Sequence, residues 1–126
     1  MNGLHLIADL HGCRCPPSFL LDAPGLEIFC VEACLRHGLT VVGRLFHAFR
    51  DAGGEPAGIT GTVVLAESHL AVHTWPEIGS ATLDVYVCNF SGDNSRQAHA
   101  LFAEVIASFA PARMETKEVT RGQLGN

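Results

Sequence analysis

The chain lacks the features of exported, membrane-spanning and nucleic-acid-binding proteins. Its apolar runs, such as TVVLA at 62–66, are far shorter than the roughly 20 residues that cross a bilayer. The first residues do not show the charged start and apolar stretch of a secretory signal. Lys and Arg total 8 against 13 Asp and Glu and form no dense cluster that could neutralise phosphates. We therefore expect a cytoplasmic protein that contacts neither membrane nor nucleic acid.

Charged residues are scarce, at 17% of the 126 residues against 48% hydrophobic residues. A chain of this length forms one domain around one core, so we expect a single domain over 1–126. Soluble domains usually carry about 25% charged residues. The shortfall indicates that a second subunit covers part of the apolar surface, and we expect a homodimer.

The five cysteines are an odd number, which does not suit a framework of disulfide bonds. Cys30 and Cys34 are one helical turn apart among apolar residues, which predicts small buried side chains. Cys13 and Cys15 follow His11, but no second half of a metal site has a fitting spacing. The sequence therefore predicts reduced thiols and no bound metal.

The hydrophobic pattern predicts two helices and a sheet. The expected helices run from an Asp22 cap to Gly38 and from about Asn94 to Phe109, and the expected strands lie at 3–10, 39–49, 59–66, 69–75, 81–88 and 113–122. Short links between the middle strands favour antiparallel neighbours. The predicted fold class is α+β, a two-layer sandwich of a mainly antiparallel sheet with two helices on one face.

Polar residues interrupt the strand-like run AESHLAVHTW at 66–75. The period of two in a strand places His69 and His73 on one face, opposite the apolar residues between them. Cys88 closes the next strand, so its thiol can lie near His73 or Ser68 if the two strands are neighbours. The run therefore contains candidate catalytic groups.

Three kinds of chemistry remain open from these residues alone. A thiol beside an imidazole, Cys88 with His73, is typical of a hydrolase. Side chains of the type that bind zinc are also present, namely His47, His69, His73 and Cys88. The third possibility is attack by the Ser68 hydroxyl on its own backbone.

The run GITGTVVLAESHLAVHTWPE, followed by LDVYVC, resembles the prokaryotic S-adenosylmethionine decarboxylases, which are pyruvoyl-dependent enzymes. The resemblance begins at GLHLIADLHGC and continues through FHAF to Cys88, whereas residues 89–126 agree only in their helix-strand pattern. The motif is specific: it combines an E-S-H triplet, a His five positions after the Ser, W-P-E, and a Cys twenty positions after the Ser.

The resemblance implies a proenzyme that cleaves itself. Ser68 is expected to attack the carbonyl carbon of Glu67, and β-elimination of the ester then separates a beta chain, 1–67, from an alpha chain, 68–126. Hydrolysis of the remaining dehydroalanine leaves a covalent pyruvoyl group, which binds the substrate amine as a Schiff base and accepts the electrons released with carbon dioxide. Because the amide-to-ester shift is unfavourable, a strained peptide is expected at the cleavage site.

The resemblance also implies roles for five further residues. His73 is the expected processing base, and Thr60 stands where the family usually has a processing Ser. Cys88 is expected to return a proton to the substrate α-carbon. Phe49 matches an aromatic residue that stacks on adenine, and Glu77 matches a carboxylate that binds the ribose hydroxyls. The implied product is the aminopropyl donor for spermidine biosynthesis.

Three departures from the family pattern flank the expected substrate pocket. The loop RDAGGEPAG is longer than usual, Ile78 and Ser80 replace common aromatic residues, and Asn89 replaces a Gly. The alternatives are therefore the same chemistry on ornithine or arginine, or an unprocessed, non-catalytic homologue.

Overall fold

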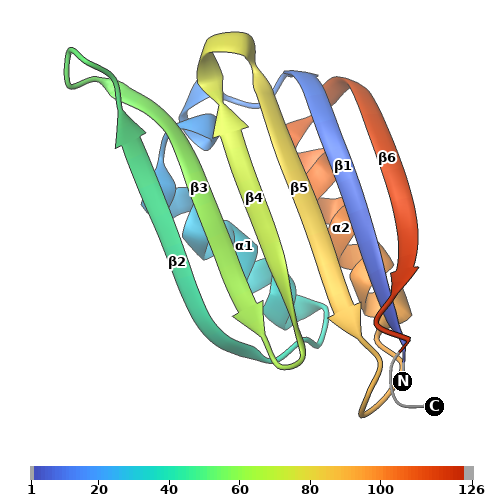
Figure 1. The fold of residues 1–126 in the computed structure, drawn as a ribbon. Helices are drawn as coiled ribbons and strands as arrows, with labels where there is room; N and C mark the ends of the chain where they lie inside the picture. The colour runs from blue at the N-terminus through green and yellow to red at the C-terminus, as the bar shows by residue number, and fades with distance from the viewer. Residues whose placement is uncertain (1, 124–126) are drawn as a thin grey trace.

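A computed structural model describes residues 2–123 as an antiparallel sheet with helices against one face (Figure 1). The elements are β1 (Gly3–Cys13), α1 (Ala23–Arg36), β2 (Val41–Arg50), β3 (Pro56–Leu65), β4 (Ser68–Trp75), β5 (Ser80–Cys88), α2 (Ser95–Phe109) and β6 (Pro111–Arg121), with short 3-10 helices at Pro17–Leu20 and Pro76–Ile78. The strand order is β2-β3-β4-β5-β1-β6, and each neighbouring pair is antiparallel. The predicted fold class is confirmed.

Helix α1 begins and ends where the sequence predicts. The Asp22 carboxylate accepts a hydrogen bond from the backbone N–H of Gly25 at 3.2 Å, which satisfies one of the free donors of the first turn. Gly38 follows the last turn with a φ of +78°, a conformation that glycine adopts without steric cost. Strand β1 is longer than predicted and reaches Cys13, because its far end pairs with Pro111 of β6.

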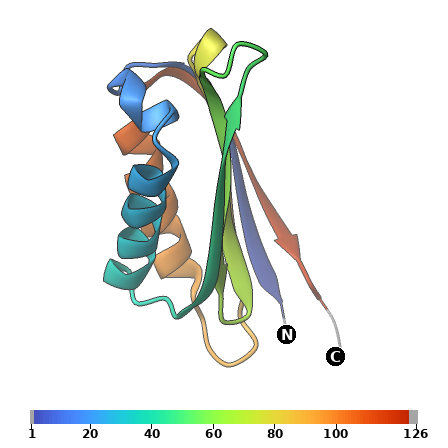
Figure 2. The ribbon, with the colours of Figure 1, turned by 90° about the vertical axis from the view of Figure 1, so that its left-hand side faces the viewer.

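The core lies between the helices and the covered face of the sheet (Figure 2). The buried side chains at its centre include Leu26, Cys30, Cys34, Leu70, Val72, Leu83, Val85, Leu101, Val105 and Phe109. Burying one large apolar side chain contributes about 1.5–3 kcal/mol. Burial raises the pKa of both helix thiols, that of Cys34 to about 12, so they stay protonated at neutral pH. Their predicted role as small buried side chains is confirmed.

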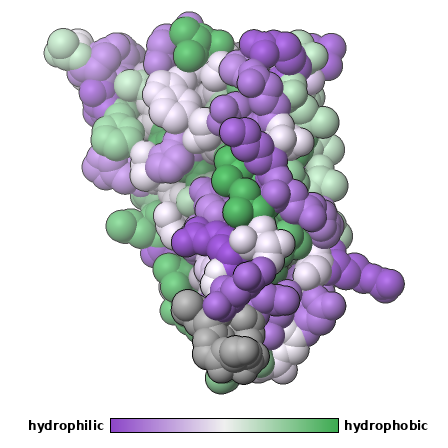
Figure 3. All heavy atoms as spheres, turned by 45° about the vertical axis from the view of Figure 1, so that its right-hand side comes forward, coloured by the Kyte–Doolittle hydropathy of each residue, from purple (hydrophilic) through white to green (hydrophobic). Residues whose placement is uncertain are grey.

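The opposite face of the sheet carries no helix in the described part of the chain (Figure 2). Residues paired across antiparallel strands point to the same side, so the register identifies the large apolar side chains that this open face exposes: Leu45, Phe49, Val64, Trp75 and Val119. They are 40–75% exposed. Toward the β6 edge, hydrophilic and hydrophobic side chains are interspersed (Figure 3). Neither described helix has the length and apolar character needed to cross a membrane.

Candidate active site

Glu67 and Ser68 lie at the tight hairpin between β3 and β4. Strand β3 ends at Leu65, which pairs with Ser68, the first residue of β4. Glu67 has a φ of +72°, a left-handed conformation that is unfavourable for a residue other than glycine. Its exposed carboxylate accepts a hydrogen bond from the Ser91 hydroxyl at 3.2 Å. The Glu67–Ser68 peptide, which is expected to be cleaved, thus lies in an exposed turn and directly follows the strained backbone of Glu67.

Cys88 lies at the same end of the sheet as Ser68. His69 of β4 pairs with Tyr86 of β5. Continuing this register by one residue places Ser68 opposite position 87 of β5, which is next to Cys88. Cys88 is buried, with 8% of its surface exposed. The sequence allowed either Ser68 or His73 to lie near this thiol. The structure places Ser68 near it.

The other predicted site residues gather at the opposite end of β4. A pocket of about 210 Å³ is lined in part by Phe49, Thr60, His73 and Glu77. Thr60 and His73 are paired across β3 and β4, and the distance between Thr60 Oγ1 and His73 Nδ1 is 3.1 Å. Trp75 also lines the pocket. No role was expected for Trp75 from the sequence, although the period of two already places it on the same face as His73.

Buried contacts fix the backbone that forms this pocket. The Thr74 hydroxyl donates to the carbonyl of Leu20 at 2.7 Å and accepts from the N–H of Ile59 at 2.9 Å. A Cβ at Gly58 would lie 2.6 Å from the Thr74 carbonyl oxygen, and one at Gly61 would overlap an aromatic ring of β2. Both glycines of the GITG motif are therefore needed for close packing.

The two ends are too far apart to act together within one chain. Ser68 and His73 are five positions apart on one extended strand, which corresponds to about 16 Å. His73 pairs with Thr82, six positions before Cys88 on β5, or about 20 Å along that strand. A hydrolase dyad of Cys88 and His73 in one chain is therefore wrong.

The zinc ligands considered from the sequence are also dispersed. His47 lies in the same row as His73, because both pair with the same residue of β3. His69 is four positions away on β4, about 13 Å along the strand, and Cys88 lies at the Ser68 end. This set does not form a metal site in the described chain.

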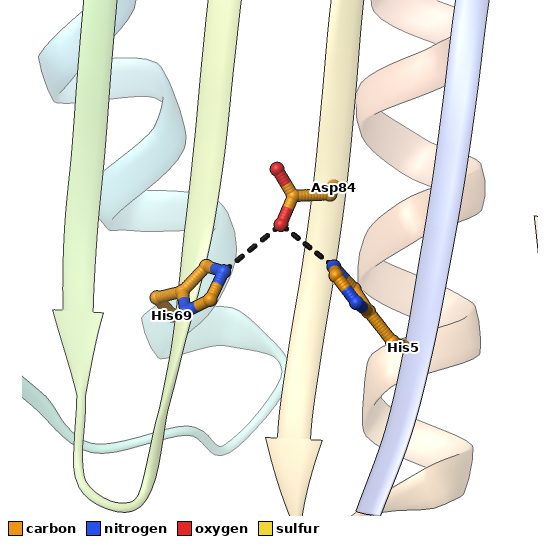
Figure 4. A group of neighbouring side chains, drawn as sticks. All are labelled: His5, His69 and Asp84. Carbon is orange, nitrogen blue, oxygen red and sulfur yellow. Dashed lines mark hydrogen bonds and ion pairs between the residues drawn. The ribbon is translucent and has the colours of Figure 1, made fainter. Parts of the chain in front are cut away.

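A different polar cluster, which the sequence analysis did not find, lies on the open face at the Ser68 end (Figure 4). One carboxylate oxygen of Asp84, Oδ2, lies 2.9 Å from Nε2 of both His5 and His69. Partial burial acts to raise the pKa of the Asp84 carboxyl, but hydrogen bonds from His69 and His5, together with electrostatic attraction to these rings, outweigh it and lower the pKa. Asp84 is therefore ionised at neutral pH.

The chain matches known proteins along nearly its whole length. The family model described as S-adenosylmethionine decarboxylase matches residues 4–122. The S-adenosylmethionine decarboxylase proenzyme of Syntrophomonas wolfei is 40% identical over 122 residues, covering 95% of this chain and 86% of that protein. The proenzyme of Methanococcus maripaludis is 35% identical over 120 residues, covering 95% and 89%. The crystal structure of the adenosylmethionine decarboxylase from Aquifex aeolicus has a TM-score of 0.81 at 32% identity, covering 98% and 92% of the two chains. The chain belongs to the S-adenosylmethionine decarboxylase family.

Proposed function

We propose that the chain is the proenzyme of a cytoplasmic, pyruvoyl-dependent S-adenosylmethionine decarboxylase, whose product is the aminopropyl donor for spermidine synthesis. The observation that carries this proposal is the Glu67–Ser68 peptide at the β3–β4 hairpin of a chain of this family. A serine follows a residue with a φ of +72° in an exposed turn. Relief of this strain favours a reaction that breaks the peptide bond.

Self-cleavage at this peptide requires one hydroxyl and one base. Ser68 Oγ attacks the carbonyl carbon of Glu67, and the peptide nitrogen leaves that carbon to give an ester. A base then removes the α-proton of residue 68, and the Glu67 carboxylate leaves with the Oγ atom. Water hydrolyses the resulting dehydroalanine and releases ammonia, which leaves a ketone at the start of 68–126. We assign the removal of the α-proton to His73, whose Nδ1 lies within hydrogen-bond distance of Thr60.

The residues around position 68 fit a ketone group there. Ser68 is half-buried at the first position of β4, and the buried Cys88 lies at the same end of β5, one position beyond the residue opposite Ser68. When formed, the pyruvoyl group supplies an electron sink for decarboxylation. We assign to Cys88 the delivery of a proton to the substrate α-carbon after carbon dioxide leaves.

Because His73 is about 16 Å from Ser68 along the strand, we propose that each active site forms between two chains of a homodimer. The open face offers an apolar surface for a second copy. If the open faces pack together about a two-fold axis perpendicular to the strands, the Ser68 end of each chain lies over the His73 end of its partner. Both halves of the predicted site then meet, twice per dimer.

The pocket at the His73 end fits a nucleoside better than a small basic amino acid. Phe49 and Trp75 offer aromatic faces on which a purine can stack, and Glu77 offers a carboxylate for two hydroxyl donors. Ornithine and arginine have neither a purine nor a pair of neighbouring hydroxyls. The substrate assignment therefore depends on these three residues.

Carbon dioxide release from S-adenosylmethionine, ornithine and arginine tests the substrate assignment. We expect turnover of S-adenosylmethionine alone, and we expect Phe49→Ala to raise its KM about tenfold through lost stacking. Leu35→Ala, at an exposed position on helix α1, is the matched control and should leave KM unchanged. Turnover of a basic amino acid with an inert adenosyl substrate would overturn the assignment.

A further inference from the structure

A continuous chain of hydrogen bonds joins side chains of four strands, β6, β1, β5 and β4, on the open face near Ser68. Arg121 Nη1 lies 3.0 Å from Nδ1 of His5, and His5 Nε2 lies 2.9 Å from the Asp84 carboxylate. The same Asp84 oxygen lies 2.9 Å from His69 Nε2 (Figure 4). The contacts lead from the β6 edge of the sheet to the start of β4, where the predicted cleavage occurs.

Donor and acceptor chemistry fixes the direction of every bond in this chain. A guanidinium can only donate, so Nδ1 of His5 accepts from Arg121 and the proton of the neutral ring lies on Nε2. An ionised carboxylate can only accept, so His69 also presents a protonated Nε2 to Asp84. A metal bound at these Nε2 atoms would displace both protons and turn an N–H of His5 toward Arg121. The arrangement is therefore suited to holding side chains in place, not to binding a cation.

The cluster lies next to the chain end that cleavage would create at position 68. After cleavage, position 68 is a free chain end, and His69 is the next residue. Its partner Asp84 belongs to the same fragment, 68–126, whereas His5 belongs to 1–67, so the bonds join the two fragments. The side chains of His5, Asp84 and His69 are 16%, 26% and 36% exposed. Their hydrogen bonds are thus partly shielded from water, which strengthens them.

We propose that this hydrogen-bonded chain positions the reactive end of β4 both before and after cleavage, and we call it the β4 anchor. The β4 anchor consists of Arg121, His5, Asp84 and His69. Its members act through residue 68 and are positioning residues; none is assigned to the bond-breaking steps. The inference rests on the proposed function, because it assumes that Ser68 is the reacting residue.

Paired substitutions of His5 test the anchor. His5→Leu removes both hydrogen bonds, whereas His5→Gln keeps an acceptor for Arg121 and a donor for Asp84. We expect His5→Leu to lower the rate of cleavage, and kcat of the cleaved enzyme, by about tenfold or more. KM should stay within about twofold, because the residues assigned to nucleoside binding, Phe49, Trp75 and Glu77, are not members of the β4 anchor. His5→Gln should retain at least about half of both wild-type rates, which a loss of packing alone would not explain.

A matched control lies between the two helices, where His37 Nε2 contacts Glu104 at 3.0 Å. The His37 side chain is 23% exposed, comparable to 16% for His5. His37→Leu removes a histidine–carboxylate pair of the same kind on the helix side of the sheet, which shares no partner with the β4 anchor, and should leave cleavage and kcat unchanged. Wild-type rates in His5→Leu, or equal losses in His5→Leu and His37→Leu, would overturn the proposal.

Two measurements on the uncleaved Ser68→Ala protein separate the anchor from the proposed function. Nitrogen-detected NMR should show the Nε2-protonated tautomer for His5 and His69, and an Nδ1-protonated ring would contradict the anchor. Amide hydrogen exchange at residues 69–71 should be about tenfold faster when His5→Leu is added, and unchanged when His37→Leu is added. Unchanged exchange in both would also overturn the anchor. Absence of cleavage in the wild type would contradict the proposed function alone.

Discussion

Replacing Ser68 with alanine is expected to leave one uncleaved chain with no detectable decarboxylase activity. Alanine fits the hairpin but lacks the hydroxyl that we propose attacks the Glu67 carbonyl. Without this step neither the ester nor the ketone can form, so activity should fall by more than about a thousandfold. Denaturing gel electrophoresis over a prolonged incubation, together with a carbon dioxide assay, measures both effects.

Cys88→Ala is the matched variant at the same end of the sheet. Its assigned role comes after cleavage, so this variant should still yield the fragments 1–67 and 68–126, at least in part. Decarboxylation should fall by about a hundredfold or more through loss of the proton donor. Cleavage of Ser68→Ala to the same extent as the wild type would contradict the maturation scheme.

Mixing two inactive variants is expected to restore activity. In a dimer of one Ser68→Ala chain and one His73→Ala chain, the first supplies His73 and the second supplies Ser68, so one intact site forms between them. With random pairing of equal amounts, about half of the His73→Ala chains should be cleaved, although neither variant is cleaved alone. Co-expression of differently tagged chains followed by gel electrophoresis measures the cleaved fraction of each.

A second mixture controls for unspecific rescue. Ser68 and Cys88 lie at the same end of one chain, so Ser68→Ala and Cys88→Ala both damage that half of the site. Their mixed dimer contains no intact site and should be no more active than Cys88→Ala alone. If His73→Ala chains stay uncleaved beside Ser68→Ala chains, the site does not form between subunits in the way we propose.

Local patterns were sufficient for the elements of the fold. The cap at Asp22, the glycine at 38 and the period of two along 69–75 each predict a structure that forms from neighbouring residues, and the structure has all three. The separation of Ser68 from His73 could also have been derived from the strand assignment, because five extended residues span about 16 Å. The family motif alone gave no reason to measure that distance.

Contacts between distant strands could not be predicted in this way. Asp84 receives hydrogen bonds from His5, 79 positions away, and from His69, 15 positions away. Strand β1 enters the sheet between β5 and β6, and only this order, with its register, brings the three side chains together. Alternation within each strand identifies their face but not their neighbours.

Intact mass spectrometry of the purified wild-type protein shows whether the chain cleaves itself between Glu67 and Ser68. Self-cleavage predicts two polypeptides, one matching residues 1–67 and one matching residues 68–126 but lighter than its sequence by ammonia, because a ketone replaces the amine of residue 68. Active protein that consists of one unbroken chain, with an ordinary serine at position 68, would contradict self-cleavage as the origin of the activity.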